Sequence, residues 1–112
     1  LKPVVKYLSS QSDSVIFEFD NLMSELLYQL DTRELANQCQ KADPLMSDDT
    51  FLYSRCVALI NGSAYYEKVR RGKEKSLWHM EFEALLYVPR EAWAQKHQST
   101  PDDYPHFTPF CF

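Results

Sequence analysis

The chain has 112 residues, of which 45% are apolar and 25% are charged, and its formal net charge at pH 7 is −4. This composition is typical of a globular domain and excludes a disordered chain. No apolar run approaches the roughly 20 residues that a membrane-spanning helix needs. The chain contains two glycines, which are few for the tight turns of an all-β domain. We therefore predict a single all-α domain over residues 1–112, built from five or six short helices.

The cysteines are three in number, Cys39, Cys56 and Cys111. Their odd number and wide spacing provide neither a disulfide framework nor a metal-binding pair. We predict reduced thiols in a cytoplasmic protein with no cofactor and no metal. Residues 1–8 are too short and too interrupted for a secretory signal. The start at Leu1 suggests that the native N-terminus lies upstream.

Residues 1–12 form an N-terminal arm that is either a short helix or extended. The first long helix is predicted from about Val15 to Leu30, capped by Asp13 or Ser14. Gaps of three and four residues give it one broad apolar face. That face contains Val15, Phe19, Leu22, Leu26 and Leu30, with Ile16, Met23 and Leu27 beside them. Residues 15–19 have aromatic side chains two apart, so a strand stays open as the alternative there.

Two further helices have clear start signals. Asp31 and Glu34 resemble a capping box, which predicts a helix to about Lys41 that ends before Pro44. The segment 47–49 (Ser-Asp-Asp) caps the next helix. Its predicted core stripe is Leu52, Cys56, Leu59 and Ile60. Gly62 is placed to end this helix in a left-handed conformation, and a short helix follows over residues 63–69.

A fifth helix is predicted from Ser76, and Pro89 separates it from a sixth over residues 90–96. The tail, residues 98–112, contains Pro101, Pro105 and Pro109 and should be extended. Its phenylalanines, Phe107, Phe110 and Phe112, are expected to pack back on the domain or to contact a partner. The predicted core of the whole domain is Leu22, Leu26, Leu52, Cys56, Leu59, Ile60, Trp78, Phe82 and Leu85.

A few side chains suggest catalysis or metal binding. His79 and Glu83 would share a face of the fifth helix, but a metal site needs three or four ligands. Cys56 on an apolar stripe is expected to be a buried, inert thiol. A small enzyme that uses Cys56, His79, Glu81 or Glu83 is the alternative.

Charged residues cluster by sign. The loop at residues 68–75 contains five of the twelve basic residues, Lys68, Arg70, Arg71, Lys73 and Lys75. Nucleic-acid binding through this loop is possible, but the net negative charge favours a solvated loop. Residues 13–49 contain nine acidic and two basic residues. Such a face would steer a basic partner, or the acids are solvated helix caps, and both interpretations stay open.

Three blocks in order carry a family resemblance. They are Ser-Asp-Asp-Thr-Phe-Leu-Tyr-Ser-Arg at 47–55, Leu-Ile-Asn-Gly-Ser-Ala-Tyr-Tyr at 59–66, and Glu-Ala-Leu-Leu-Tyr-Val-Pro-Arg-Glu-Ala at 83–92. On these blocks, residues 47–97 resemble a bacterial family known as domain of unknown function 4240. The chain departs from the family in having Cys56 where a Trp is usual and a basic loop where others have an acidic segment.

The resemblance implies a mostly helical fold and assigns no reaction, so it identifies no catalytic residue. For its polar positions we expect structural roles: Asp48 and Asp49 cap a helix, and Gly62 ends it. Arg55 is expected to pair with a buried carboxylate such as Glu83.

The function predicted from these observations is non-enzymatic protein binding, in the manner of an immunity or inhibitor protein that neutralises a basic toxin or nuclease. Small size, an acidic N-terminal half and the lack of an assembled catalytic motif support this prediction. The candidate partner-binding residues are the acids Asp20, Glu25, Asp48 and Asp49 and the aromatics Tyr65, Tyr66, Tyr104 and Phe107.

Overall fold

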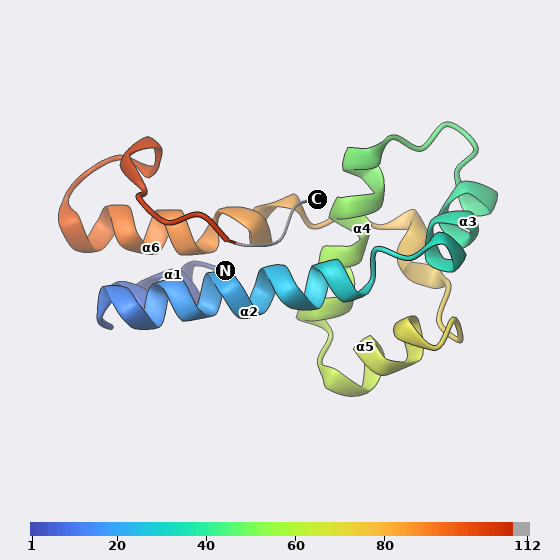
Figure 1. The fold of residues 1–112 in the computed structure, drawn as a ribbon, viewed down its shortest axis with the longest axis horizontal. Helices are drawn as coiled ribbons and strands as arrows, with labels where there is room; N and C mark the ends of the chain where they lie inside the picture. Colours follow the sequence, from blue (N-terminus) through green and yellow to red (C-terminus); the bar gives the residue numbers. More distant parts are fainter. Residues whose placement is uncertain (109–112) are drawn as a thin grey trace. The chain divides into compact units, whose positions relative to one another are not determined.

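The computed structural model describes residues 1–108, and in this range the chain is helical and contains no strand (Figure 1). The all-α prediction is therefore confirmed for this part of the chain. The α-helices are α1 Lys2–Ser9, α2 Asp13–Gln29, α3 Arg33–Ala42, α4 Asp48–Ile60, α5 Ser63–Arg70 and α6 Val88–His97. The 3-10 helices are η1 Ser76–His79, η2 Glu83–Tyr87 and η3 Pro101–Asp103. Over residues 1–108, none of the helices has both the length and the apolar content needed to cross a bilayer.

The described chain divides into two compact units. Unit 1 contains residues 1–24 and 84–108, and unit 2 contains residues 25–83. The chain passes from one unit to the other within α2 and again within η2. The single domain predicted over residues 1–112 stays a prediction.

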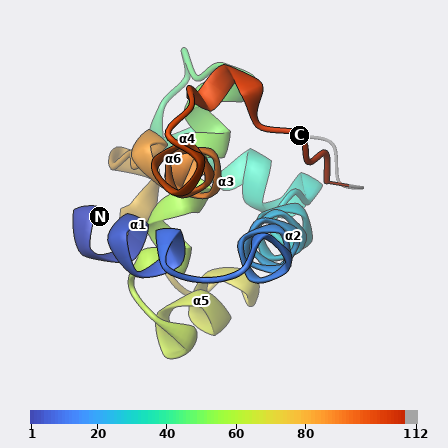
Figure 2. The ribbon, with the colours of Figure 1, turned by 90° about the vertical axis from the view of Figure 1, so that its left-hand side faces the viewer.

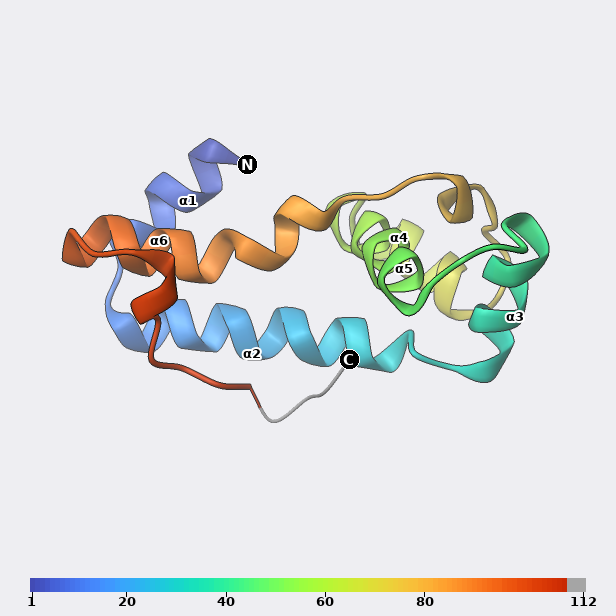
Figure 3. The ribbon, with the colours of Figure 1, turned by 90° about the horizontal axis from the view of Figure 1, so that it is seen from above.

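In unit 1, α1 packs against α6, and α6 runs antiparallel to the first part of α2 (Figures 2 and 3). Residues 1–12 thus form the short helix that was one of the two expectations. Pro3 lies in the first turn of α1, where a missing N–H costs nothing. Val5 and Leu8 are the buried residues of α1.

Helix α2 differs from the prediction in its cap and in its buried face. The hydroxyl of Ser12 accepts a hydrogen bond from the Val15 N–H at 3.3 Å, so the cap is neither Asp13 nor Ser14. Residues 15–19 are helical, which excludes the strand. Leu22 is 58% exposed, and its place in the predicted core was wrong. Ile16, Asp20, Met23, Leu27 and Leu30 are buried and follow each other at gaps of three and four, and Ser24 is buried beside Met23.

In unit 2, α4 packs against α5 and η1, and η1 packs against α3. Thr32, rather than Asp31, caps α3 by accepting a hydrogen bond from the Leu35 N–H at 3.2 Å. Ser47 caps α4 as predicted, with its hydroxyl 3.1 Å from the Thr50 nitrogen. The core of this unit contains Leu30, Leu35, Cys39, Phe51, Val57, Ala58, Tyr66, Val69, Leu77 and Trp78.

The buried face of α4 is also shifted from the predicted stripe. Cys56 is fully buried as expected, but Leu52 and Leu59 are only half-buried and Ile60 is 41% exposed. Phe51 and Val57 take the core positions instead. After α4, Gly62 has φ +92°, a positive value that favours glycine as predicted, but its ψ of 171° differs from that of a left-handed helical residue. It directly precedes α5.

The predicted fifth helix is replaced by the separate 3-10 helices η1 and η2. The segment between them is hydrogen-bonded to α4: the Ser54 hydroxyl donates to the Met80 carbonyl at 2.6 Å. The Phe82 N–H donates to the Tyr53 carbonyl at 3.0 Å. Because these groups bond to α4, a continuous helix over this segment does not form. Pro89 does not separate two helices but lies in the first turn of α6.

The tail is partly packed against α2 within unit 1. After η3, the buried Tyr104 donates a hydrogen bond from its hydroxyl to Asp20 at 2.9 Å. His106 Nε2 donates to the Asn21 amide oxygen at 2.7 Å. Phe107 is 88% exposed, so it does not pack back on the protein. Residues 109–112, with Phe110 and Phe112, lie outside the described part of the chain.

Candidate functional site

A pocket of about 230 Å³ lies in unit 2 at the start of α4. Asp31 lines it from the turn before α3, and the other lining residues come from the first two turns of α4. These are Asp48, Asp49, Phe51, Leu52 and Arg55. Five of the six, all except Asp31, belong to the first sequence block that carries the family resemblance. The pocket therefore brings together the polar signature residues of that block.

The helical repeat explains this grouping within α4. Asp48, Leu52 and Arg55 are separated by four and then three residues, which places them on one face of the helix. Ser47 fixes where α4 begins, because its hydroxyl accepts the Thr50 N–H. The position of Asp48 and Asp49 in the first turn also suits the positive end of the helix.

Arg55 is the buried cation of the pocket, with 2% of its surface exposed. Its Nη1 donates to the Leu27 carbonyl at 2.9 Å, and its guanidinium carbon lies 4.4 Å from the centre of the Phe51 ring. Its Nε is buried and has no hydrogen-bond partner within residues 1–108. Burial lowers the Arg55 pKa, and the Asp31 carboxylate opposes this shift. The group stays charged, because a guanidinium does not lose its proton in proteins.

The expected partner of Arg55 was a buried carboxylate such as Glu83. Glu83 is exposed, so it is not such a carboxylate. Among the carboxylates, Asp31 most strongly opposes the effect of burial on the Arg55 pKa. The sequence suggested Asp31 only as a helix cap.

Asp48 and Asp49 are exposed and remain available for binding. Since Ser47 caps the helix, their carboxylates are not required as caps. In the part of the chain that the structure describes, neither carboxylate forms a hydrogen bond or an ion pair. Three carboxylates and one guanidinium line the pocket, so its net charge is negative.

The other predicted partner-binding residues do not line this pocket. Three are engaged inside the fold: Asp20 and Tyr104 hydrogen-bond to each other, and the Tyr66 hydroxyl donates to the Leu26 carbonyl at 2.7 Å. Burial raises the pKa of Tyr66, and burial together with Asp20 raises the pKa of Tyr104. We therefore leave these three out of the proposed binding surface.

The remaining candidates differ in accessibility. Glu25 is exposed, and Tyr65 is half-buried, with a hydroxyl that is buried and unpaired within residues 1–108. Both belong to unit 2. Phe107 is exposed and belongs to unit 1.

All five cationic side chains of the basic loop are exposed: Lys68, Arg70, Arg71, Lys73 and Lys75. Arg70 forms an ion pair with Glu67 at 2.8 Å. Gly72, with φ +75°, accepts a hydrogen bond at its carbonyl from the Gln38 amide at 3.2 Å. The nucleic-acid alternative stays a prediction.

The residues of the enzyme alternative are not assembled. Cys56 is fully buried, and burial raises the pKa of its thiol to about 12. His79 is exposed. His79 and Glu83 lie on two different 3-10 helices, so the shared helix face does not exist. Across residues 1–108, no three His, Cys, Asp or Glu side chains are grouped so as to hold a metal ion.

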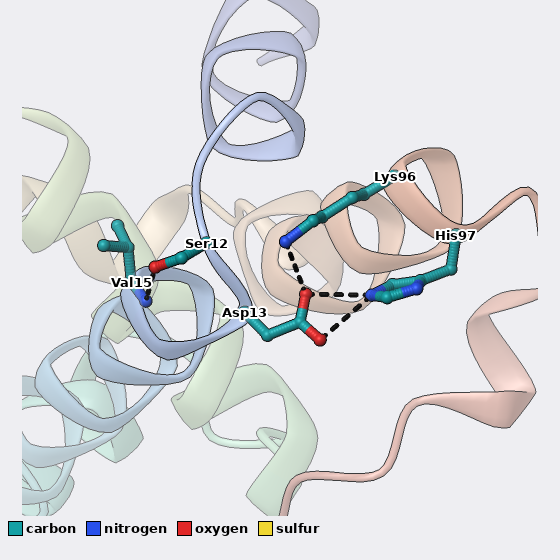
Figure 4. Close-up of polar contacts among 5 residues, drawn as sticks. All are labelled: Ser12, Asp13, Val15, Lys96 and His97. Atoms are coloured by element: carbon teal, nitrogen blue, oxygen red, sulfur yellow. Dashed lines mark hydrogen bonds and ion pairs between the residues drawn. The ribbon is translucent and has the colours of Figure 1, made fainter.

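A polar cluster in unit 1 was missed from the sequence. Asp13 Oδ1 lies 2.8 Å from Lys96 Nζ and 2.8 Å from His97 Nε2 (Figure 4). Hydrogen bonds from Lys96 and His97 lower the pKa of Asp13. The sequence did contain a signal for this contact. Asp13 lies in the first turn of one helix, and Lys96 and His97 lie in the last turn of another, where acidic and basic residues respectively are favoured.

Unit 1 also contains a larger pocket, of about 600 Å³. Residues of α1 and α6, together with Leu1, Ala84 and Tyr87, line it, and its cations are Lys2 and Lys6. Both lysines are exposed. The pocket therefore has no buried polar group of the kind that Arg55 provides in unit 2.

The fold and the pocket define a helical protein with an acidic pocket at the start of α4. The family model described as protein of unknown function (DUF4240) matches residues 1–95. The chain belongs to this family. The match extends the resemblance, first seen over residues 47–97, to the N-terminal part of the chain. No curated protein and no solved structure gave a match to the chain.

Proposed function

We propose that this chain is a non-enzymatic module that binds a basic protein, and that it acts as an immunity or inhibitor protein toward a basic toxin or nuclease. The observation that carries the proposal is the acidic pocket of unit 2. In it, Asp48 and Asp49 are exposed and have no partner in the described chain.

Uncompensated carboxylates favour a cationic partner for two reasons. A surface of one sign accelerates the encounter with a partner of opposite charge. It also disfavours acidic partners and nucleic acids, because like charges in contact cost several kcal/mol. Unit 2 has further exposed acidic residues that add negative charge, namely Glu25, Asp31 and Glu34.

The state of Cys56 supports binding rather than catalysis. A nucleophilic cysteine acts as the thiolate. With a pKa raised to about 12, the Cys56 thiol is protonated at neutral pH, and its side chain is inaccessible to a substrate.

The experiment uses the genes that flank this one in its source genome. Each flanking product with a basic composition is expressed in a test bacterium, with and without the full chain. We expect one product to arrest growth and the chain to relieve the arrest. In purified form, the two proteins should form a complex whose association slows as the salt concentration rises.

Matched variants connect this relief to the pocket. The double variant Asp48→Asn/Asp49→Asn removes two charges from the pocket and should reduce the relief. The control Glu81→Gln/Asp102→Asn removes two charges from exposed residues outside it and should protect fully. If no flanking product arrests growth, or if the pocket variant protects as well as the control, the proposal is wrong.

A further inference from the structure

Residues 99–108 form a strap that leaves the end of α6 and turns back to α2 within unit 1 (Figure 3). Two hydrogen bonds fix the strap on α2. The Tyr104 hydroxyl donates to Asp20 at 2.9 Å, and His106 Nε2 lies 2.7 Å from the Asn21 amide oxygen. The strap therefore contacts α2 in the manner of a short peptide ligand.

Aromatic rings complete these contacts. The His106 ring stacks on Phe17 with 4.7 Å between the ring centres. The ring centre of Tyr104 lies 5.8 Å from that of Phe17 and 6.2 Å from that of Trp93. Within residues 1–108, no backbone–backbone hydrogen bond joins residues 104–107 to α2, so side chains hold this part of the strap. We call the residues that receive it the strap site: Phe17, Asp20, Asn21 and Trp93.

Asp20 makes the strap site dependent on its occupant. It is 9% exposed, and its carboxylate accepts hydrogen bonds from Tyr104 and, at 3.4 Å, from Ser24. Because a buried carboxylate is costly without hydrogen bonds, an empty strap site is unfavourable. A strap that leaves the site is therefore expected to dock again, either in its own chain or in another copy.

Gln98 joins α6 to the strap in a conformation that disfavours the closed arrangement. Its φ is 51° and its ψ is 44°, which lie in the left-handed helical region. Among residues 1–108 it is the one non-glycine residue with a positive φ. A residue with a Cβ is strained in this region, and helices that end in it usually have glycine there. Opening the hinge at Gln98 removes this strain.

The residues between the hinge and Tyr104 allow the strap to swing away from its own chain. Residues 99–103 are all exposed, so their release uncovers no core. The six steps from Gln98 to Tyr104 span at most about 20 Å when extended. An opened strap can therefore reach the strap site of a second copy that lies beside the first.

We propose that two copies of this chain exchange their straps, so that the strap of each copy occupies the strap site of the other. The second copy is the occupant to which the observations point, because its strap has every side chain that the site contacts. Reciprocal exchange keeps these contacts and changes only the hinge at Gln98. The exchange goes beyond the proposed function, because the strap site belongs to unit 1 and the acidic pocket to unit 2.

The first experiment uses cross-linking to detect a strap that is docked on another copy. Two full-length proteins carry one new cysteine each, Leu22→Cys beside Asn21 in one and Phe107→Cys beside His106 in the other. Leu22 and Phe107 are 58% and 88% exposed, and neither belongs to the strap site. Both proteins also carry Cys111→Ser. The remaining native cysteines are buried: Cys39 and Cys56.

One of the two proteins carries an affinity tag that changes its mass. The proteins are unfolded, refolded together at high concentration and treated with a short bis-maleimide. We expect a tagged–untagged product in which mass spectrometry locates the link between positions 22 and 107. The product should decrease after refolding at low concentration, where the closed monomer is favoured. Leu45→Cys, at a leucine that is 93% exposed and outside the strap site, replaces Leu22→Cys as the matched control and should give no such link.

The second experiment changes the strain at the hinge and measures the monomer–dimer equilibrium by analytical ultracentrifugation. Gln98→Gly relieves the closed form and should weaken dimerisation by about tenfold or more, because each dimer opens two hinges. Gln98→Val adds a β-branched side chain, which increases the strain and should strengthen dimerisation. Thr100→Val is the control, because it adds the same side chain at a residue whose φ of −109° suits it. This control should dimerise like the native chain.

Several results would overturn the inference. A chain that stays monomeric at every concentration, or a dimer without the link between positions 22 and 107, would show that the strap stays in its own chain. Equal dimerisation of the two Gln98 variants would exclude strain at the hinge as the cause. The cross-linking experiment keeps the native hinge, so it decides the question even if a Gln98 variant does not fold.

Discussion

The carboxylate of Asp13 lies 2.8 Å from Nε2 of His97, which joins the start of α2 to the end of α6 within unit 1 (Figure 4). The antiparallel arrangement of the two helices makes this contact possible. It places an acid at a positive helix end and a base at a negative one, and both positions are stabilising. Lys96 adds a second cation at 2.8 Å.

The Asp13 contact predicts a pH-dependent contribution to stability. The pKa of Asp13 in the folded chain is below its ordinary value of 3.8. Its contribution is therefore complete above the unfolded pKa and is lost as the pH falls through the lower, folded pKa. Because the side chain is 38% exposed, solvent screening keeps the contribution below about 1 kcal/mol.

Urea denaturation of the native chain and of Asp13→Asn at pH 7 and pH 3 measures this effect. The native chain should lose more stability between the two pH values than the variant does. Asp102→Asn, at another exposed carboxylate, should behave like the native chain. An equal pH dependence in all three proteins would show that the contact contributes nothing.

The hydrogen bond between Tyr104 and Asp20 should stabilise the packing of the tail on α2. Asp20 also accepts a hydrogen bond from the Ser24 hydroxyl at 3.4 Å, and both Asp20 and Tyr104 are buried. Tyr104→Phe removes one donor from the buried carboxylate, so we expect a loss of about 1–3 kcal/mol in the free energy of unfolding. The control is Tyr7→Phe, at a tyrosine that is 65% exposed. A Tyr104→Phe chain as stable as this control would contradict the prediction.

Two leucines of α2 test which face of the helix is buried. Leu27 is 0% exposed and Leu22 is 58% exposed. Leu27→Ala should cost about 2–5 kcal/mol through the cavity that it leaves. Leu22→Ala should cost well under half of that, because little apolar surface is uncovered. Chemical denaturation of the two variants decides the question, and a larger loss for Leu22→Ala would reverse the assignment of the buried face.

The thiol of Cys56 should be unreactive in the folded protein. It is fully buried, and its pKa is raised to about 12, so the reactive thiolate is scarce at neutral pH. Alkylation followed by peptide mass spectrometry should show Cys56 labelled in denaturant and protected without it. Rapid labelling of native Cys56 at pH 7 would contradict this prediction and would support the cysteine-enzyme alternative.

The sequence by itself determined most of the helices, because their signals are local. The Ser47 hydroxyl caps α4 by accepting a hydrogen bond from the Thr50 N–H, only three residues away, and α5 begins directly after Gly62. Helical spacing is also sufficient to place Asp48, Leu52 and Arg55 on one face of α4. Such contacts join residues that are near in the chain, so the sequence predicts them without knowledge of the fold.

The tertiary structure decided which apolar face is buried and where helices are interrupted. Leu22 and Leu27 are both compatible with an amphipathic α2, and only packing selects Leu27. Residues 80–82 lose their helix because Tyr53 and Ser54 provide hydrogen-bond partners from α4. These partners lie more than twenty residues away in the chain, and local propensity contains no information about them.

For the candidate site too, the sequence determined one part and the tertiary structure decided the rest. Asp48, Asp49 and Arg55 were recognisable in the sequence as signature residues, but their joint pocket with Asp31 was not. The burial of Arg55 depends on the Leu27 carbonyl, 28 residues earlier in the chain. Asp31, which precedes a different helix, partly opposes the effect of burial on the Arg55 pKa. Electrostatic balance in a buried site depends on distance in space, so only the folded chain determines it.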